Sequence, residues 1–141
     1  MSNQAPNVLV VDTNESVLQF AVAAVNKVGY VAVGRKTAES ALALLRTTPS
    51  LQVVLSDICL ESVSGPEFVR QALRDRPELK VVFMTGGVDS ISFRRTDPVL
   101  AKPFDLRDLQ EAIDTVLHHS HPAIAELLPA YPERRRLIAP A

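Results

Sequence analysis

The chain has 141 residues, which fits one domain of roughly 100 to 150 residues with a single hydrophobic core. Its 47% hydrophobic and 22% charged residues are typical of a globular protein and exclude a disordered or fibrous chain. The net charge of -1, from 15 basic and 16 acidic side chains, argues against direct binding to nucleic acid or to an anionic membrane.

The first half of the chain predicts two strand–helix units and a third strand. Short Val-rich runs predict strands at residues 7–11, 30–34 and 51–56, because the longer segments between them carry apolar residues at helical spacing. The first helix is expected to begin near Glu15, with Asn14 as its N-cap, and to stop at Gly29, a residue suited to a left-handed cap. Thr37 is the expected N-cap of the second helix.

The second half continues the same alternation. A polar connection over residues 57–65 leads into a helix with Phe68, Val69 and Ala72 facing inward. A fourth strand at 81–84, a loop, a short helix at 89–95 and an edge strand at 98–101 precede a last amphipathic helix that ends near residue 119. We therefore expect one domain over residues 1–119 and a proline-containing tail over 120–141 that is too short for an output domain.

Polar side chains follow the predicted strands where the strands end. Alternating strands and helices imply a parallel sheet with helices on both faces, whose ligand site lies at the carboxyl ends of the strands. Asp12 and Asp57 each come directly after a Val-rich strand, and Thr85 and Lys102 follow the fourth and fifth strands. An isolated Asp in such a place is as often a turn or cap residue. Two carboxylates, a hydroxyl and an ammonium together suit Mg²⁺-dependent phosphoryl transfer with Asp57 as the nucleophile.

With these residues the chain resembles the receiver domain of bacterial response regulators over about residues 7–117. The resemblance implies a flavodoxin-like (CheY-like) α/β fold, a doubly wound five-stranded parallel sheet of order 2-1-3-4-5 with helices on both faces. It also implies a stand-alone receiver without a covalent output domain. The motifs that carry it are Val10-Val11-Asp12, Asp57 with Gly65 in the following loop, Thr85 after the fourth strand, and Lys102-Pro103-Phe104.

The resemblance also implies roles for individual residues. Asp57 would be the phosphoacceptor, Thr85 the hydroxyl that turns toward the phosphoryl group, and Lys102 its ion-pair partner. Mg²⁺ would be held by Asp12, Asp57 and the backbone carbonyl of Cys59. The chain would therefore catalyse its own phosphorylation without being a turnover enzyme.

The resemblance further implies partners and a location. The phosphoryl group would come from a histidine kinase or a histidine phosphotransfer protein, and phosphorylation would change binding to an unknown downstream protein. No leader peptide or membrane span is evident, and Cys59 is the single cysteine, so we expect a protein of the bacterial cytoplasm. A homodimer through the last helices is possible on the sequence alone.

Four departures from the family pattern affect these expectations. Thr13 replaces the second of two adjacent acidic residues, so metal affinity and phosphorylation rate should fall. Glu61 stands where the family usually has Pro, and either faces solvent or returns a carboxylate to the pocket. Val99 stands where an aromatic ring is common, and the segment from Thr85 to Lys102 is shorter than usual.

Two other readings stay open at this point. A pseudo-receiver that binds partners independently of phosphorylation is favoured by Thr13 and disfavoured by the joint presence of Asp57, Thr85 and Lys102. A flavin-binding or phosphatase-like enzyme on the same fold is the third class.

Overall fold

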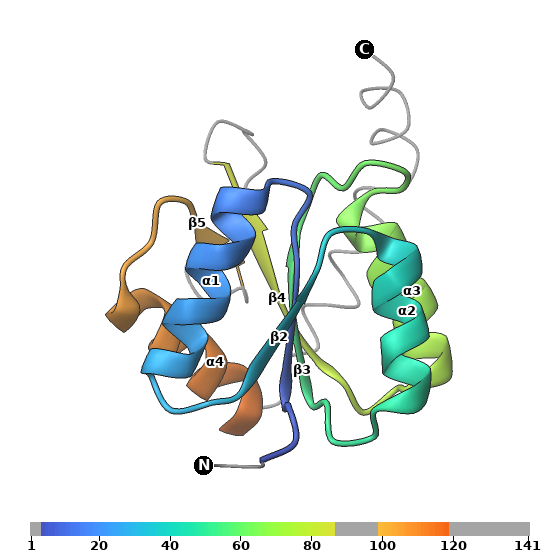
Figure 1. Ribbon diagram of the computed structural model, residues 1–141, viewed down its shortest axis with the longest axis horizontal. Helices are drawn as coiled ribbons and strands as arrows, with labels where there is room; N and C mark the ends of the chain where they lie inside the picture. Colours follow the sequence, from blue (N-terminus) through green and yellow to red (C-terminus); the bar gives the residue numbers. More distant parts are fainter. Residues whose placement is uncertain (1–3, 87–98, 119–141) are drawn as a thin grey trace.

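The computed structural model describes residues 4–86 and 99–118 (Figure 1). Five parallel strands form one sheet in the order β2-β1-β3-β4-β5, which confirms the predicted fold class and strand order. The strands are β1 (Val8–Val11), β2 (Ala32–Arg35), β3 (Val53–Asp57), β4 (Lys80–Thr85) and β5 (Val99–Ala101). The helices are α1 (Glu15–Lys27), α2 (Ala38–Thr47), α3 (Gly65–Asp75) and α4 (Leu106–His118).

Local signals place the helix ends. Asn14 Oδ1 accepts the Val17 N–H at 3.1 Å at the start of α1, and Thr37 Oγ accepts the Ser40 N–H at 3.1 Å at the start of α2, as predicted. Gly29 follows the end of α1 with a φ of 108°, the left-handed conformation that glycine adopts without steric cost. Ser64 caps α3 and was not predicted as a cap from the sequence.

Some strand ends differ from the prediction by one or two residues. β2 begins at Ala32 instead of residue 30, and the Tyr30 hydroxyl before it donates to Asp114 Oδ1 on α4 at 2.8 Å. β3 runs one residue further than predicted and includes Asp57. The predicted short helix at 89–95, the start of the last strand at residue 98 and the tail at 120–141 lie outside the described residues.

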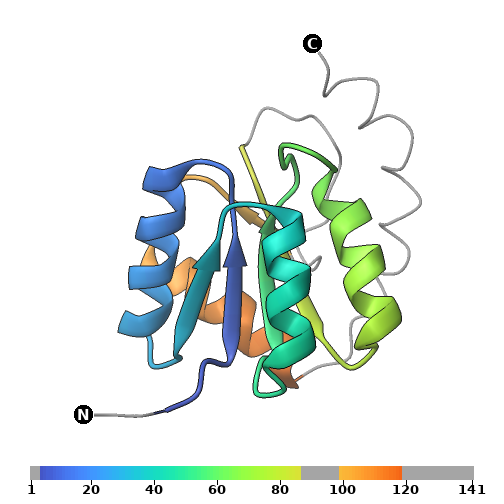
Figure 2. The ribbon, with the colours of Figure 1, turned by 45° about the vertical axis from the view of Figure 1, so that its right-hand side comes forward.

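The sheet has a separate apolar core on each face, because alternate side chains of a strand point to opposite sides. Figures 1 and 2 show α1 and α4 covering one face and α2 and α3 the other. On β1, Val8 and Val10 pack with α1 and α4, whereas Leu9 and Val11 pack with α2 and α3.

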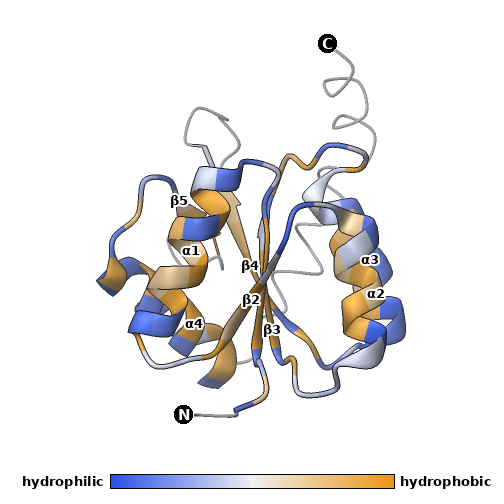
Figure 3. Ribbon diagram, viewed as in Figure 1, coloured by the Kyte–Doolittle hydropathy of each residue, from blue (hydrophilic) through white to orange (hydrophobic). Residues whose placement is uncertain are grey.

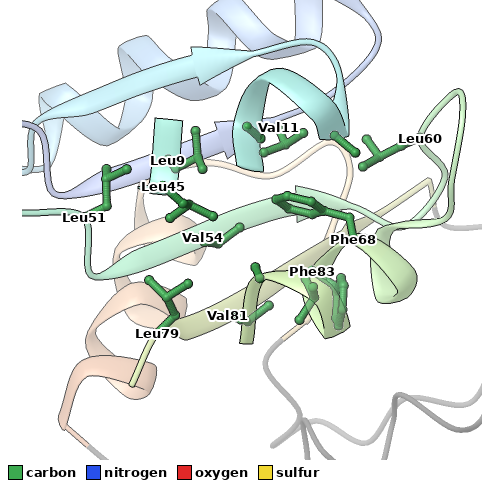
Figure 4. Packing of buried hydrophobic residues seen from close by; sticks show 14 of the residues in the cluster. Leu9, Val11, Leu45, Leu51, Val54, Leu60, Phe68, Leu79, Val81 and Phe83 are labelled. Carbon is green, nitrogen blue, oxygen red and sulfur yellow. The ribbon is translucent and has the colours of Figure 1, made fainter. Parts of the chain in front are cut away.

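Both cores draw on the helices as well as the strands. Each helix has both hydrophobic and hydrophilic residues along its length, as the colouring in Figure 3 shows. Figure 4 shows Phe68 of α3 and Leu45 of α2 gathered with Leu9, Val54 and Phe83 from three strands. Complete burial of such a side chain stabilises the fold by about 1.5–3 kcal/mol.

Arg76 joins the ends of α2 and α3 at the edge of the sheet away from the carboxyl ends of the strands. Its guanidinium donates to the carbonyl oxygens of Leu45 at 2.9 Å and Thr48 at 3.3 Å, and to that of Leu51. The last carbonyls of a helix have no partner within the helix, so Arg76 satisfies groups that α2 leaves open. Within the part of the chain that the structure describes, no helix is long and apolar enough to cross a membrane.

The order in which strands are added to the sheet reverses between β1 and β3. The chain passes from β1 through α1 to β2 at one edge, then crosses to β3 on the other side of β1. Such a reversal leaves a crevice at the carboxyl ends of the two strands. Val11 of β1 pairs with Ser56 of β3, so the next residues along the two strands, Asp12 and Asp57, come out side by side.

Candidate functional site

Three charged side chains meet at this crevice. The Lys102 ammonium lies 2.9 Å from Asp12 Oδ2 and 3.2 Å from Asp57 Oδ1, so one cation bridges the two carboxylates. The side chain of Asp12 is 1% exposed, that of Asp57 15% and that of Lys102 20%. The predicted convergence of these residues, which come from the ends of three different strands, is confirmed in space.

Asp12 has a local role beside its part in the ion cluster. Its Oδ1 accepts the Asn14 N–H at 2.9 Å while its Oδ2 accepts from Lys102. The first contact shapes the turn that leads into α1, which begins directly after Asn14. One oxygen of this carboxylate therefore serves the turn, and the other serves the ion cluster.

Thr85 and Lys102 are held together by the main chain. Thr85 is the last residue of β4, is buried, and pairs with Ala101 of β5. The Lys102 N–H donates to the Thr85 carbonyl oxygen at 2.8 Å, which extends the strand pairing by one step. The hydroxyl and the ammonium thus belong to neighbouring strands at the same edge of the sheet as the carboxylates.

The surroundings of the cluster favour the charged form of Lys102 and disfavour the charged form of Asp57. Burial, followed by the nearby negative charge of Asp12, raises the pKa of Asp57, and the charge and hydrogen bond of Lys102 together with a backbone hydrogen bond from Cys59 only partly oppose this. Burial lowers the pKa of Lys102, but the hydrogen bonds and charges of Asp12 and Asp57 outweigh it and raise that pKa overall. The ammonium is therefore firmly protonated, whereas the Asp57 carboxylate lies in a site that disfavours its charge.

The donor set fits a hard cation but is short of one carboxylate. Among residues 4–86 and 99–118, no three His, Cys, Asp or Glu side chains gather as a metal-binding group. The Thr13 Oγ, next to Asp12 in the chain, is buried and has no hydrogen-bond partner in the described structure. Two carboxylates and an unpaired hydroxyl are all oxygen donors, the type that Mg²⁺ prefers, with water completing its coordination.

The other residues that depart from the family pattern lie outside the ion cluster. Glu61 is exposed, which fits the solvent-facing alternative. Val99 is half-buried and packs against the core beneath α2 and α3. Cys59 is exposed and forms an isolated antiparallel bridge with Ser64, so its backbone lies in the loop that follows Asp57.

Comparison with known proteins decides the family. Residues 8–114 match the family model described as the response regulator receiver domain. The chain belongs to this family. The receiver protein CpdR of Brucella abortus (strain 2308) is 33% identical over 116 residues, which cover 78% of this chain and 95% of CpdR.

Other relatives of this receiver are larger proteins or solved structures. The sensor kinase CckA of the same organism is 26% identical over 117 residues, but the match covers only 12% of CckA. A crystal structure of a CheY-like receiver domain protein from Methanospirillum hungatei JF-1 has a TM-score of 0.67 and 26% identity, covering 79% of this chain and 92% of that one. These similarities support a two-component response regulator.

Two contacts of the receiver site were not predicted from the sequence. The Ser56 hydroxyl donates to the Asp57 carbonyl oxygen at 2.9 Å, and Gly65 lies against the same carbonyl. Neither serine in a strand nor glycine at the start of a helix carries a specific signal. Only the position of Gly65 in the family pattern pointed to the second contact.

Proposed function

We propose that this receiver accepts a phosphoryl group on Asp57 from a histidine kinase or a histidine phosphotransfer protein, and that phosphorylation switches its binding to a downstream protein. The observation that carries the proposal is the Lys102 ammonium placed between Asp12 and Asp57. A purely structural sheet has no need for one buried and one part-buried carboxylate with a lysine at this edge, because burying charges is costly.

The chemistry follows from the acceptor and its neighbours. A carboxylate oxygen of Asp57 attacks the phosphorus of the donor phosphohistidine, the P–O bond forms, the P–N bond breaks, and the imidazole leaves with its electron pair. Lys102, already 3.2 Å from Asp57 Oδ1, stabilises the negative charge of the transferring group. The protein takes up one phosphoryl group per chain and so acts as a switch and not as a turnover enzyme.

A divalent cation completes this proposal. Asp12, Asp57 and the Cys59 carbonyl would hold Mg²⁺, with the Thr13 hydroxyl beside them. When bound, the ion would neutralise charge on the phosphoryl oxygens. After transfer, we expect the Thr85 hydroxyl to turn toward the phosphoryl group, while Lys102 remains its ion-pair partner. Localisation in the bacterial cytoplasm stays a prediction.

One observation favours a second candidate, a pseudo-receiver that binds its partner without being phosphorylated. Thr13 leaves the site with two carboxylates, and Lys102 already neutralises part of their charge. A divalent cation therefore gains less electrostatic free energy on binding here than at a site with three carboxylates.

Intact mass spectrometry separates the two candidates. The purified protein is incubated with a small acyl phosphate, with and without Mg²⁺, beside Asp57→Asn and a matched control, Asp75→Asn, at an exposed position at the end of α3. We expect one phosphoryl adduct in the wild type and in Asp75→Asn, and none in Asp57→Asn or without Mg²⁺. If no adduct forms and calorimetric titration detects no Mg²⁺ binding, the pseudo-receiver is the correct reading.

A further inference from the structure

The start of α3 lies unusually close to the main chain of the phosphoacceptor. A Cβ placed on Gly65 would be 2.1 Å from the Asp57 carbonyl oxygen, 2.9 Å from the Ile58 Cα and 3.0 Å from the Asp57 carbonyl carbon. Each of these atoms belongs to the backbone and cannot rotate away as a side chain can. Only glycine at this position lets the helix and the Asp57–Ile58 peptide pack as they do.

Hydrogen bonds fix the two successive peptides that follow Asp57. The Gly65 N–H donates to the Ile58 carbonyl oxygen at 2.6 Å, and the Ile58 N–H donates to the Met84 carbonyl oxygen at 3.0 Å. Met84 is the residue before Thr85 in β4. The main chain after Asp57 is therefore held between the first residue of α3 and the end of the neighbouring strand.

Side-chain packing adds to this attachment. Ile58 is buried in the same core as Phe68 and Val69 of α3. Ser64 caps the helix by accepting the Glu67 N–H at 3.1 Å, and it also pairs with Cys59 across the loop. A displacement of the first turn of α3 would therefore displace residues on both sides of the Asp57–Ile58 peptide.

We propose that Gly65 is a positioning residue of the phosphoacceptor site, and that the first turn of α3 holds the Asp57 carboxylate and the Cys59 carbonyl in their reactive places. The proposal rests on the function proposed above, because it names what sets the geometry of that reaction. Gly65 touches no reacting atom and acts through the main chain.

Gly65→Ala tests the proposal against a matched control, Gly34→Ala. At Gly34 the nearest atom to an added Cβ is the Leu18 Cδ1 at 2.9 Å, the end of a side chain that can rotate away. Both variants add one methyl group under steric pressure, but only Gly65 presses on the acceptor backbone. A misplacement of about 1 Å can cost ~100-fold in rate, so we expect phosphorylation of Gly65→Ala to slow by at least about tenfold.

Three measurements are made well below the unfolding temperature of each variant. They are the maximal rate of phosphorylation by a small acyl phosphate, the Mg²⁺ dissociation constant, and the backbone amide NMR shifts of residues 57–59. We expect Gly65→Ala to change all three, and Gly34→Ala to match the wild type in all three. A role of Gly65 in stability alone would lower the unfolding temperature and leave the rate and the Mg²⁺ affinity of the folded protein unchanged.

A second pair of variants decides the matter if Gly65→Ala does not fold. Ser64→Ala removes the N-cap of α3, and Thr37→Ala removes the equivalent N-cap of α2, each with a 3.1 Å hydrogen bond. The proposal expects slower phosphorylation in Ser64→Ala alone, since only that cap adjoins the acceptor loop. Equal rates in both would overturn it.

The outcomes also separate this proposal from the proposed function. If the wild type takes up no phosphoryl group, the proposed function fails, whatever the variants do. If the wild type is phosphorylated and Gly65→Ala keeps the same rate and the same Mg²⁺ affinity, the positioning role of Gly65 alone is refuted.

Discussion

Replacing Lys102 by Met tests how much the Lys102 ammonium contributes to the stability of the fold through its contacts with Asp12 and Asp57. The change keeps a side chain of similar length but removes the ammonium that contacts Asp12 at 2.9 Å and Asp57 at 3.2 Å. At an effective dielectric constant of about 20, each contact at this range corresponds to ~5 kcal/mol of Coulomb attraction before the cost of desolvation is subtracted. Truncating one partner of a buried ion pair costs about 3–5 kcal/mol, and the partial exposure of Lys102 favours the lower end. We therefore expect the free energy of unfolding to fall by about 3 kcal/mol.

Urea denaturation at neutral pH measures this loss, and two further variants locate its cause. Lys36→Met breaks the exposed ion pair with Glu15 at 3.0 Å and should cost less than about 1 kcal/mol, as exposed pairs do. The double variant Lys102→Met/Asp57→Asn removes the unpaired charge together with its partner and should recover most of the loss. A loss in Lys102→Met no larger than that in Lys36→Met, or one that persists in the double variant, would refute the reasoning.

The pH dependence gives an independent check. The pKa of Asp57 is already raised by burial and by Asp12, and loss of the Lys102 ammonium raises that pKa further. A raised pKa in the folded state contributes stability at low pH that is lost as the pH rises through that pKa. The difference in unfolding free energy between wild type and Lys102→Met should therefore shrink as the pH is lowered and Asp57 takes up a proton.

Three further predictions concern other parts of the molecule. Thr13→Asp adds a carboxylate next to Asp12 and should tighten Mg²⁺ binding by about tenfold, measured by calorimetric titration; unchanged affinity would show that Thr13 does not limit the site. Burial and the hydrogen bond to Asp114 raise the pKa of Tyr30 from its ordinary value of 10.0 to about 12, so this contact should stabilise the fold below pH 10, and that stabilisation should be lost between pH 10 and 12. Tyr30→Phe should cost about 1 kcal/mol at neutral pH in urea denaturation and abolish that alkaline loss, and a fall of the same size in both proteins would contradict it. Arg76→Gln should cost about 2–4 kcal/mol by the same assay, because carbonyl oxygens at the end of α2 lose a charged hydrogen-bond donor. A change within about 0.5 kcal/mol, roughly that of an ordinary surface substitution, would show that Arg76 does not stabilise the end of α2.

Local information in the sequence predicted the main features of this protein. The Val-rich runs and the helical spacing between them are short-range patterns, so they predicted five strands of a parallel sheet and the main helices. Asn14, Thr37 and Gly29 act within one turn of their own position, and the structure confirms each at its helix end. Asp12 and Asp57 were identifiable for the same reason, since each lies at the carboxyl end of a Val-rich run.

Tertiary structure alone decided how these parts meet. Lys102 is far from Asp12 in the chain, and only the order and register of the strands bring its ammonium onto both carboxylates. The contact between Tyr30 and α4 depends on how these segments pack, and the close approach of Gly65 to Asp57 depends on how α3 packs on the sheet. Such contacts join segments that are remote in sequence, and no local pattern encodes the distance between them. The sequence by itself thus determined which residues stand at the edge of the sheet, whereas the packing of α3 and the register of β1, β3 and β5 determined their geometry.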